Sequence, residues 1–600
     1  MPGLSIVYGT DVMKESLSSL KHHSNIIVRK DILGKLTFVI RSGFEGYPFL
    51  EYTNNHFSAF IEGIIYNLSD DEIKDGISKI ASSYLKELDY KNEINKFVSN
   101  CSGEFIVFIH FAKTENCLLF NDQWGRLPFF WSKQDNNLIL SREIKFILHY
   151  IPKIHYDKIA LLEHLVLRYS LGNRTIFQDI SRLLPGHLIT QKGNRFDIEE
   201  AVHLNYELLC LKKRSRKHYA EKASNILHSS TRNGLSKLQG FNSKVVDISG
   251  GYDSRAVLGV VSQLDKNVIP LTKDSITGDE SSIAILVAKT CRLKTLLIKP
   301  NHDFSSSTMQ EILYRTDGFL NGRYATSLYQ VAEELVKKLK EPIAEFKGFG
   351  GEFLRHPLKT RVYYKNMLDV IYAAVFSNTL IDSVCQCLGL KEKEVKSFWQ
   401  NFFSSNYKEE KIEDKVMHYY FNYYNLYIGK VEDQHRIHLW PVNPMMSSEW
   451  LRFSTTEIPR SQIDYKLFEE ILFTISPQIA VKEIPIWDKK SRTQKILDLI
   501  ENHRTIQRML VFPKRIQELK RIVQKRRWKK IAETDSRRKT LIAEIEKLYQ
   551  NTRTIRDNFD RKSIIQFYQK EFGPNNLSVQ LLHSIFLYMN KIEATFSKQI

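Results

Sequence analysis

The chain has 600 residues, of which 42% are hydrophobic and 26% are charged. At roughly 100–200 residues per domain, this length predicts two to four domains with buried cores. The 12% aromatic content and the ordinary glycine and proline counts exclude a disordered, collagen-like or low-complexity protein. The six cysteines include no CxxC pair, which excludes a disulfide-stapled secreted scaffold and a cysteine zinc cluster.

The sequence carries no sign of secretion or of membrane insertion. No basic region followed by an apolar run opens the chain, so no signal peptide is expected. No stretch of about 18 uncharged apolar residues occurs, so no transmembrane helix is expected. The sequence therefore predicts a cytoplasmic protein.

The net charge of +19, from 87 basic and 68 acidic residues, is unevenly distributed. Between Lys489 and Thr540, 18 basic residues stand against 5 acidic ones, an excess of 13. Most of the excess therefore belongs to a tail and not to the main fold.

The first 200 residues contain short β-type runs separated by turn signals. The expected strands are 36–40, 57–66, 103–110, 116–120, 128–131, 137–141 and 187–190, with a helix at 71–88. Strands in runs with helices to one side indicate a layered α+β domain.

From about residue 211 helices and strands alternate. The expected helices are 217–238, 255–264 and 280–291, and the expected strands are 244–248, 268–272 and 295–299. This alternation is typical of a parallel sheet covered by helices. From Phe304 to about Leu472 the chain is expected to be almost wholly helical, with one packed core helix at 370–390.

The most informative segment is Ser249-Gly-Gly-Tyr-Asp-Ser254, which lies between an apolar strand and a helix. The two glycines permit a tight turn, and the helix N-terminus and serine hydroxyls can bind phosphate oxygens. Asp253 would repel bare phosphate, so it implies an intervening Mg²⁺. A Gly-Gly turn with a serine N-cap is the alternative, but the combination of strand, loop and helix favours the phosphate site.

The SGGYDS segment resembles the pyrophosphate-binding loop of the asparagine synthetase family. That family cleaves ATP to AMP and pyrophosphate and activates a carboxylate as an acyl-adenylate, which a nitrogen nucleophile attacks to form an amide. Its relatives include β-lactam synthetase, carbapenam synthetase and lasso-peptide cyclases. Further segments that resemble the family follow in the expected order: 122–130, 138–144, 172–177, 184–187, 278–280 and 347–354.

The resemblance implies an α+β Ntn-hydrolase-like domain followed by an α/β parallel-sheet ATP-pyrophosphatase domain, of the adenine nucleotide α-hydrolase-like fold, with a helical extension. The glutaminase-like domain is expected at 1–200, the ATP-pyrophosphatase domain at 205–485 and the basic helical extension at 489–600. ATP and Mg²⁺ are the expected cofactors.

The resemblance also assigns roles to single residues. It implies that Asp253 and Glu352 are catalytic and hold Mg²⁺ beside the ATP phosphates. Arg255 and Lys482 are the candidate catalytic cations, with Lys489 as a further candidate. The other expected contacts to ATP and pyrophosphate are Ser249, Gly250, Gly251, Tyr252, Ser254, Leu271, Thr272 and Gly348. A plain core position for Leu271 and a solvated charge for each cation stay open as alternatives.

Two departures concern the glutaminase half of the family. Pro2 stands where glutamine-using members have the nucleophilic cysteine, and proline has no thiol. Glu62 stands where the family has an asparagine that binds glutamine. The N-terminal domain is therefore expected to have the glutaminase fold without the activity.

Another departure concerns amide formation. Phe349 occupies a loop position where relatives carry a glutamate or a tyrosine that assists the nucleophile, and it cannot exchange protons. The glutamate that assists the nucleophile in the family has no counterpart in register here. Glu432 lies close in sequence to the expected position but cannot be assigned to it. Asparagine as the product is therefore in doubt.

The pattern of basic and apolar residues over 513–530 predicts a basic amphipathic helix. An anionic partner, such as nucleic acid, anionic lipid or an acidic protein, is one interpretation. A helix that packs on the synthetase domain with its charges in water is the other.

The sequence thus predicts an ATP-dependent, AMP-forming carbon–nitrogen ligase without its own glutaminase activity. Its partners would be a small-molecule or peptide carboxylate and a nitrogen nucleophile, and a homodimer is compatible with the resemblance. The alternatives are a glutamine- or ammonia-dependent asparagine synthetase, a degenerate nucleotide-binding relative, and a protein that binds nucleic acid or membranes through its tail.

Overall fold

The fold was analysed in a computed structural model of the chain. It describes all residues except 36, 194, 210–213, 275–279, 302, 355–363, 375–380, 481–533, 572–576 and 600.

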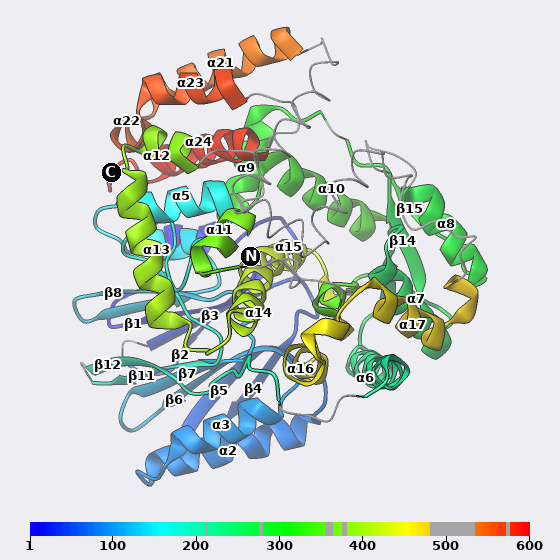
Figure 1. The fold of residues 1–600 in the computed structure, drawn as a ribbon. Helices are drawn as coiled ribbons and strands as arrows, with labels where there is room; N and C mark the ends of the chain where they lie inside the picture. Colours follow the sequence, from blue (N-terminus) through cyan, green and yellow to red (C-terminus); the bar gives the residue numbers. More distant parts are fainter. Residues whose placement is uncertain are drawn as a thin grey trace.

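The N-terminal region, residues 1–200, contains two six-stranded antiparallel sheets (Figure 1). The first sheet has the order β10-β8-β9-β1-β3-β2 and the second β12-β11-β7-β6-β5-β4. The strands are β1 (Gly3–Tyr8), β2 (Ile27–Ile32), β3 (Thr37–Gly43), β4 (Phe49–Thr53), β5 (Phe57–Ile65), β6 (Gly103–Phe111), β7 (Asn116–Asn121), β8 (Phe130–Gln134), β9 (Asn137–Ser141), β10 (Ser181–Arg182), β11 (His187–Lys192) and β12 (Arg195–Glu200).

Helices cover the outer faces of both sheets. They are α1 (Lys14–Ser19), α2 (Asp70–Leu85), α3 (Tyr90–Asn100), α4 (Ile144–Leu148) and α5 (Lys158–Leu167). Leu4 and Ile6 of β1 pack against Phe60 and Phe108 of the second sheet, so the two sheets share an apolar layer. The helix–sheet–sheet–helix layering agrees with the Ntn-hydrolase-like fold that the resemblance implies.

Alternation along the strands explains this layering. In β5, Ile61 and Ile65 pack with α2 and α3, whereas Phe60 and Ile64 face the first sheet. The helix α2 begins at a capping box, in which Ser69 and Glu72 satisfy each other's backbone N–H groups.

A five-stranded parallel sheet follows, as the helix–strand alternation predicts. Its order is β15-β14-β13-β16-β17. The strands are β13 (Ser243–Asp247), β14 (Ile269–Lys273), β15 (Leu296–Ile298), β16 (Ile343–Phe346) and β17 (Trp440–Val442). The strand order runs in opposite directions on the two sides of β13, so a topological switch point lies between β13 and β16.

Helices cover both faces of this sheet. Val331 and Leu335 of α10 pack with Val245 on one face, and Val257 of α7 packs with Val246 on the other. The helical and turn elements of this region are α6 (Arg216–Lys237), α7 (Tyr252–Leu264), α8 (Glu280–Thr290), α9 (Ser306–Arg315), α10 (Gly322–Lys338), η1 (Gly351–Leu354), α11 (Met367–Ala374), α12 (Ile381–Leu388), α13 (Glu392–Asn406), α14 (Ile412–Tyr423), η3 (Tyr424–Ile428), α15 (Gly429–His435), η4 (Pro444–Met446), α16 (Ser448–Arg452), η5 (Phe453–Glu457), η6 (Arg460–Gln462), α17 (Tyr465–Ile475) and η7 (Pro477–Ile479).

Two expectations from the sequence are wrong. The segment after Phe304 is not almost wholly helical, because β16 and β17 complete the parallel sheet. These strands have only four and three residues, too few to show a periodic pattern. The core helix expected at 370–390 is interrupted, since α11 ends at Ala374 and α12 begins at Ile381.

The C-terminal helices pack against the rest of the molecule. They are α21 (Thr534–Asn551), α22 (Arg553–Asn558), α23 (Arg561–Glu571) and α24 (Leu577–Thr595). Ile585, Phe586 and Met589 of α24 are buried in the same apolar cluster as Leu161 of α5 and Leu313 of α9. Figure 1 shows this group of helices over α5 and α9, far from α2 and α3. The basic helix expected at 513–530 lies outside the described residues.

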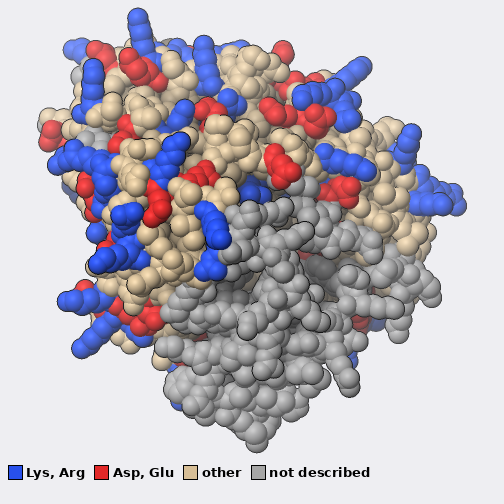
Figure 2. All heavy atoms as spheres, turned by 90° about the horizontal axis from the view of Figure 1, so that it is seen from above, with Lys and Arg blue, Asp and Glu red and all other residues tan. Residues whose placement is uncertain are grey.

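The surface charge of the described residues is mixed. On the face in Figure 2, Lys and Arg side chains are interspersed with Asp and Glu. This pattern agrees with an excess of positive charge that is concentrated between Lys489 and Thr540, most of which the structure does not describe. Among the described helices, none has the length and apolar character needed to cross a bilayer.

Candidate functional site

Two glycine-rich loops meet at the switch point of the parallel sheet. One follows β13 and the other follows β16, and these strands are direct parallel neighbours, with Val246 opposite Phe346. Parallel neighbours end at the same edge of a sheet, so both loops leave it side by side. In open α/β sheets, this edge at the switch point is where ligands bind.

The first loop, 248–251, is shaped by hydroxyl hydrogen bonds. The Ser249 backbone N–H donates to Ser254 Oγ at 3.1 Å, and the Gly251 N–H donates to Ser249 Oγ at 3.1 Å. The helix α7 begins at Tyr252, three residues earlier than the sequence pattern predicts, and Gly251 is its N-cap. The loop therefore presents the N-terminus of a 13-residue helix, which favours an anion.

The second loop, 347–352, lies against the first turn of α7, directly after the first loop. A Cβ on Gly348 would lie 2.7 Å from the Ser254 nitrogen, and a Cβ on Gly351 would overlap the Asp253 carboxylate. Only glycine fits at these two positions without a shift of the loops. The structure thus brings together Asp253, Ser254 and Gly348, which are separated by about 95 residues in the sequence.

The carboxylate of Glu352 is oriented from the helical region. Tyr424 Oη donates to Glu352 Oε2 at 2.9 Å and accepts a hydrogen bond from the Gly350 N–H at 2.6 Å. Trp450 Nε1 donates to the Gly350 carbonyl at 3.0 Å. Gly350 has φ +101°, and a Cβ there would collide with the Met445 carbonyl. Tyr424 opens the π-helical turn η3, a type of turn that is frequent at functional sites.

The donor set fits a magnesium ion that is bound together with phosphate. Asp253 lies in the first turn of α7 and Glu352 in the second loop, which touches that turn, and Mg²⁺ in nucleotide sites takes one or two protein carboxylates plus phosphate oxygens. No group of three or more His, Cys, Asp or Glu suited to a metal occurs among the described residues.

The side chain of Arg255 turns back toward the loop. It is buried, and its guanidinium donates to the Gly250 carbonyl at 3.1 Å and to the Ile479 carbonyl at 3.5 Å. Burial lowers the pKa of Arg255 from its ordinary value. This geometry favours bracing of the loop over direct contact with a phosphate. Tyr252 is also buried, and its hydroxyl donates to Glu469 at 2.7 Å, which ties α7 to α17.

The remaining predicted residues differ in their placement. Leu271 and Thr272 end β14 beside the first loop, with Leu271 opposite Asp247. The Leu271 side chain is fully buried in the core, so at this position only the backbone could contact the adenine base of ATP. Lys482 and Lys489 lie outside the described residues.

A partly buried ion cluster beneath the two loops was not foreseen. Asp247 Oδ2 lies 2.9 Å from Lys273 Nζ and 3.5 Å from Lys347 Nζ. Glu345 Oε2 lies 3.0 Å from Lys347 Nζ and 2.8 Å from His435 Nδ1. The only signal in the sequence is that Lys273 and Lys347 stand at or just after strand ends.

The cluster shifts the pKa values of its acids. Burial opposes ionisation of Asp247, but Lys273 and Lys347 more than offset it and hold the pKa of that carboxyl below its usual value. Burial likewise opposes ionisation of Glu345, and His435 and Lys347 hold its pKa well below the usual range. The carboxylates are therefore charged at neutral pH and fix the two lysines at the strand ends.

The position that binds glutamine in the family is filled by a carboxylate network. Glu62 is fully buried and accepts hydrogen bonds from the Leu4 N–H at 2.7 Å, from Tyr47 Oη at 2.9 Å and from Arg142 Nε at 2.8 Å. Tyr47 Oη also lies 3.1 Å from the Pro2 carbonyl. Glu62 is thus fully engaged within the protein.

The network continues across the boundary to the helical region. Arg142 pairs with Asp433, and Arg126 pairs with Glu104 at 2.6 Å and with Glu432 at 3.5 Å. All of these side chains are buried. Glu432, the carboxylate without an assigned place in the sequence, therefore joins the two regions.

The surroundings of Phe349 and Cys101 bear on what these two residues can do. Phe349 packs edge-on to the Tyr424 ring at 6.5 Å and lies 5.6 Å from Lys347 Nζ. The second loop therefore has an aromatic ring at the position where a proton-exchanging group was expected from the resemblance. The Tyr424 hydroxyl, from η3, contacts the same loop at the Gly350 N–H. Cys101 is buried, and burial raises the pKa of its thiol strongly, so it is not an activated nucleophile.

Residues 50–201 match the family model of a glutamine amidotransferase domain. Amidase chyE of Penicillium rubens is 22% identical over 252 residues, which cover 38% of this chain and 36% of that protein. Amidase chry2 of Gibberella zeae is 24% identical over 196 residues, which cover 32% of this chain and 27% of that protein. The chain thus aligns with about a third of the length of each relative.

Two solved structures were compared with the chain. The allosteric regulatory enzyme of purine biosynthesis is 11% identical, with a TM-score of 0.24, over 54% of this chain and 91% of that one. The glutamine phosphoribosylpyrophosphate amidotransferase from B. subtilis is 10% identical, with a TM-score of 0.22, over 58% and 81%. The domain match confirms the predicted amidotransferase resemblance of the N-terminal region. The matched residues, 50–201, do not include Pro2.

Proposed function

Because the chain carries a glutamine amidotransferase-like domain, a type of domain that serves amide chemistry, we propose that it is an ATP-dependent, AMP-forming ligase. The ligase would adenylate a carboxylate and pass it to a nitrogen nucleophile. One observation carries this proposal: at the switch point of a parallel sheet, Gly348 and Gly351 of the 347–352 loop touch the first turn of α7, which carries the Asp253 carboxylate.

The loops supply what binding of a triphosphate requires. The α7 N-terminus and the backbone N–H groups of the first loop would bind pyrophosphate oxygens, and Ser249 would add its hydroxyl. Asp253 and Glu352 would hold Mg²⁺, which when bound supplies charge neutralisation at the phosphates. Catalysis would then rest on orientation of the carboxylate toward the α-phosphate and on electrostatic stabilisation.

The nitrogen would come from outside the N-terminal domain. Pro2 offers no thiol, and Glu62 fills the position of the glutamine-binding asparagine with three internal hydrogen bonds. We therefore propose that the nucleophile is free ammonia or an amine on the substrate. Phe349 in the second loop argues against asparagine as the product, so the carboxylate would differ from aspartate.

The test is ATP–pyrophosphate exchange. The full chain is incubated with Mg²⁺, ATP, labelled pyrophosphate and a panel of carboxylates that includes aspartate. The expected result is exchange that depends on one carboxylate and disappears in Asp253→Asn. The matched control is Asp265→Asn, at the other end of α7, which should retain exchange. Tight Mg²⁺–ATP binding without exchange on any acid would favour a degenerate nucleotide-binding protein.

A further inference from the structure

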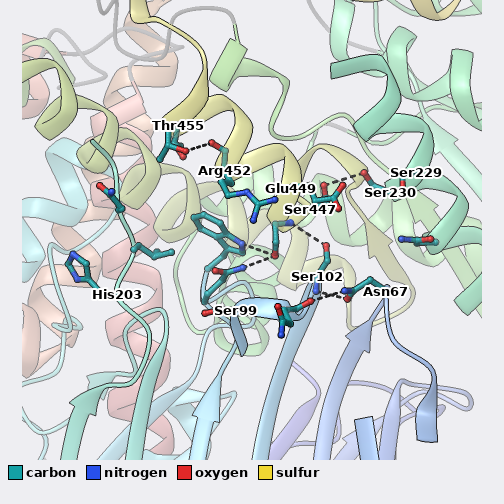
Figure 3. Close-up of a pocket in the computed structure, with 18 of the residues that line it drawn as sticks. Asn67, Ser99, Ser102, His203, Ser229, Ser230, Ser447, Glu449, Arg452 and Thr455 are labelled. Carbon is teal, nitrogen blue, oxygen red and sulfur yellow. Dashed lines mark hydrogen bonds between the residues drawn. The ribbon is translucent and has the colours of Figure 1, made fainter. Parts of the chain in front are cut away.

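A cavity of about 440 Å³ lies between the N-terminal region and the parallel-sheet region. In Figure 3 Asn67 and Ser102 of the N-terminal region face Ser447 and Glu449 at the start of α16. Residues 203–209 and the helix α6 complete the wall. Its volume is within the range of small-molecule sites, which are frequent at such boundaries.

The lining is neutral and polar. Of the nineteen lining residues, thirteen are Ser, Thr, Asn or Gln, and only Glu449 and Arg452 carry a full charge. Several of these groups already bond within the protein, as the Thr455 hydroxyl does to the Leu451 carbonyl, but an apolar ligand would offer no partner to the hydrogen-bonding capacity that remains. A strongly charged ligand would find one carboxylate and one guanidinium, whose fields oppose each other. The matching chemistry is a neutral molecule with many hydroxyl groups.

The floor of the cavity is fixed by hydrogen bonds. Ser448 Oγ accepts from Gln123 Nε2 at 2.8 Å and from Trp124 Nε1 at 3.1 Å, and it donates to the Cys101 carbonyl at 2.9 Å. The Ser448 N–H donates to Ser102 Oγ at 3.2 Å. Because the floor is already ordered, its side chains lose little entropy when a ligand binds.

The same short helix reaches the second glycine-rich loop. In α16, Glu449 and Arg452 line the cavity, whereas Trp450 is fully buried and donates to the Gly350 carbonyl at 3.0 Å. The π-helical turn η5 follows α16 directly and carries the lining residue Thr455. A change in the position of α16 would therefore act on Gly350.

We propose that this cavity binds a neutral polyhydroxylated small molecule of sugar size, and that binding is transmitted through Trp450 to the 347–352 loop. The site is separate from the proposed ATP site, and its occupancy does not depend on the proposed ligase activity. Contacts to both regions would also stabilise their association, because the ligand binds only where both walls are present.

Binding is tested by saturation-transfer NMR on the full chain with neutral sugars: glucose, N-acetylglucosamine, maltose and sucrose. Ser229→Phe fills the cavity from α6, and Asn233→Leu removes an amide at constant size. Asn225→Leu, an exposed position on the same helix outside the lining, is the matched control. Circular dichroism melting establishes that each variant is folded.

At least one sugar should show saturation transfer from the protein. Its affinity, from titration of that signal, should fall about tenfold in each cavity variant and stay unchanged in the control, as the loss of one or two hydrogen bonds implies. Glucuronate, the charged counterpart of glucose, should bind about tenfold more weakly than a neutral sugar that binds. No transfer to any sugar, or transfer that both cavity variants retain, would overturn the site.

The coupling is read separately. The chain is labelled with 5-fluorotryptophan, and the Trp450 signal is assigned by its absence in Trp450→Phe. Addition of the bound sugar should shift this ¹⁹F signal in the wild type and not in Ser229→Phe. Sugar binding that leaves the Trp450 signal unmoved would overturn the transmission to the loop. Because no nucleotide is present, failure here is distinguishable from failure of the proposed ligase function.

Discussion

Replacement of Arg142 by methionine should loosen the boundary between the N-terminal region and the helical region. Arg142 donates to Glu62 Oε1 at 2.8 Å, pairs with Asp433, and also donates to the Pro128 carbonyl. All three charged side chains are buried. Methionine keeps most of the volume but leaves the Glu62 carboxylate without its cationic partner.

The magnitude follows from the cost of an uncompensated buried charge. Removal of one partner from a buried ion pair costs about 3–5 kcal/mol, which corresponds to a decrease of about 100- to 4,000-fold in the equilibrium constant against local opening. Asp433 keeps Arg436 at 3.4 Å, so the lower end of this range is expected. Neutralisation of the stranded carboxylate in Arg142→Met/Glu62→Gln should restore part of the loss, because glutamine Oε1 can still accept from the Leu4 N–H.

Native-state hydrogen exchange, followed by mass spectrometry, measures this opening directly. Peptides that cover β5 and α15 should exchange faster by about 100-fold or more in Arg142→Met, since the stranded charge opens that boundary. Burial already raises the pKa of Glu62, so its contribution to stability is present below pH 4.5 and is lost as the pH rises through the folded-state pKa. The excess exchange should therefore decrease at low pH. Unchanged exchange in Arg142→Met at pH 7, or no recovery in the double variant, would show that Arg142 does not hold this boundary closed.

Three further predictions concern the candidate site. In Gly351→Ala the new methyl group would overlap the Asp253 carboxylate, so Mg²⁺–ATP affinity in calorimetry should fall about tenfold or more, whereas Gly240→Ala, which points into open space, should bind normally. Tyr424→Phe removes the hydroxyl that orients Glu352, so the Mg²⁺ concentration for half-maximal ATP binding should rise about three- to tenfold; an unchanged value would contradict the assigned role of the hydroxyl. Lys273→Met removes a cation that keeps the pKa of the Asp247 carboxyl below its ordinary value of 3.8. The ion pair stabilises the fold above pH 3.8, and this stabilisation is lost as the pH falls through the folded-state pKa. Its melting temperature should therefore lie below that of the wild type at pH 7, with a gap that narrows below about pH 4, and an equal gap at both pH values would contradict the ion cluster.

The features that the sequence predicts well are contiguous ones. The strand–SGGYDS–helix segment shows its glycines, hydroxyls and carboxylate within six residues, so local chemistry is enough to suggest an anion site. The long strands β5 and β6 have nine residues each, and their composition is clear. By contrast, β16 and β17 are too short for a pattern, although they complete the sheet and position the second loop.

The features that the sequence does not predict depend on distant contacts. Nothing near Asp247 shows that Lys347 lies 3.5 Å away, because this contact exists only when β13 and β16 pair. Arg255 follows a phosphate-type loop, which suggests a phosphate contact, yet its guanidinium reaches the Gly250 and Ile479 carbonyls. Such assignments need the tertiary structure, since the sequence gives the charge of a side chain but not its direction.

We propose that Asp253 in the first turn of α7 and Glu352 in the loop that touches it hold one nucleotide-associated Mg²⁺. Calorimetric titration of ATP into the wild type, Asp253→Asn, Glu352→Gln and the double variant, with and without Mg²⁺, tests it most directly. Binding should need Mg²⁺, and each single variant should weaken it about tenfold or more. The double variant should lose less binding free energy than the sum of the two single variants, because both carboxylates act on one ion. ATP binding that is indifferent to Mg²⁺, or losses that simply add, would contradict it.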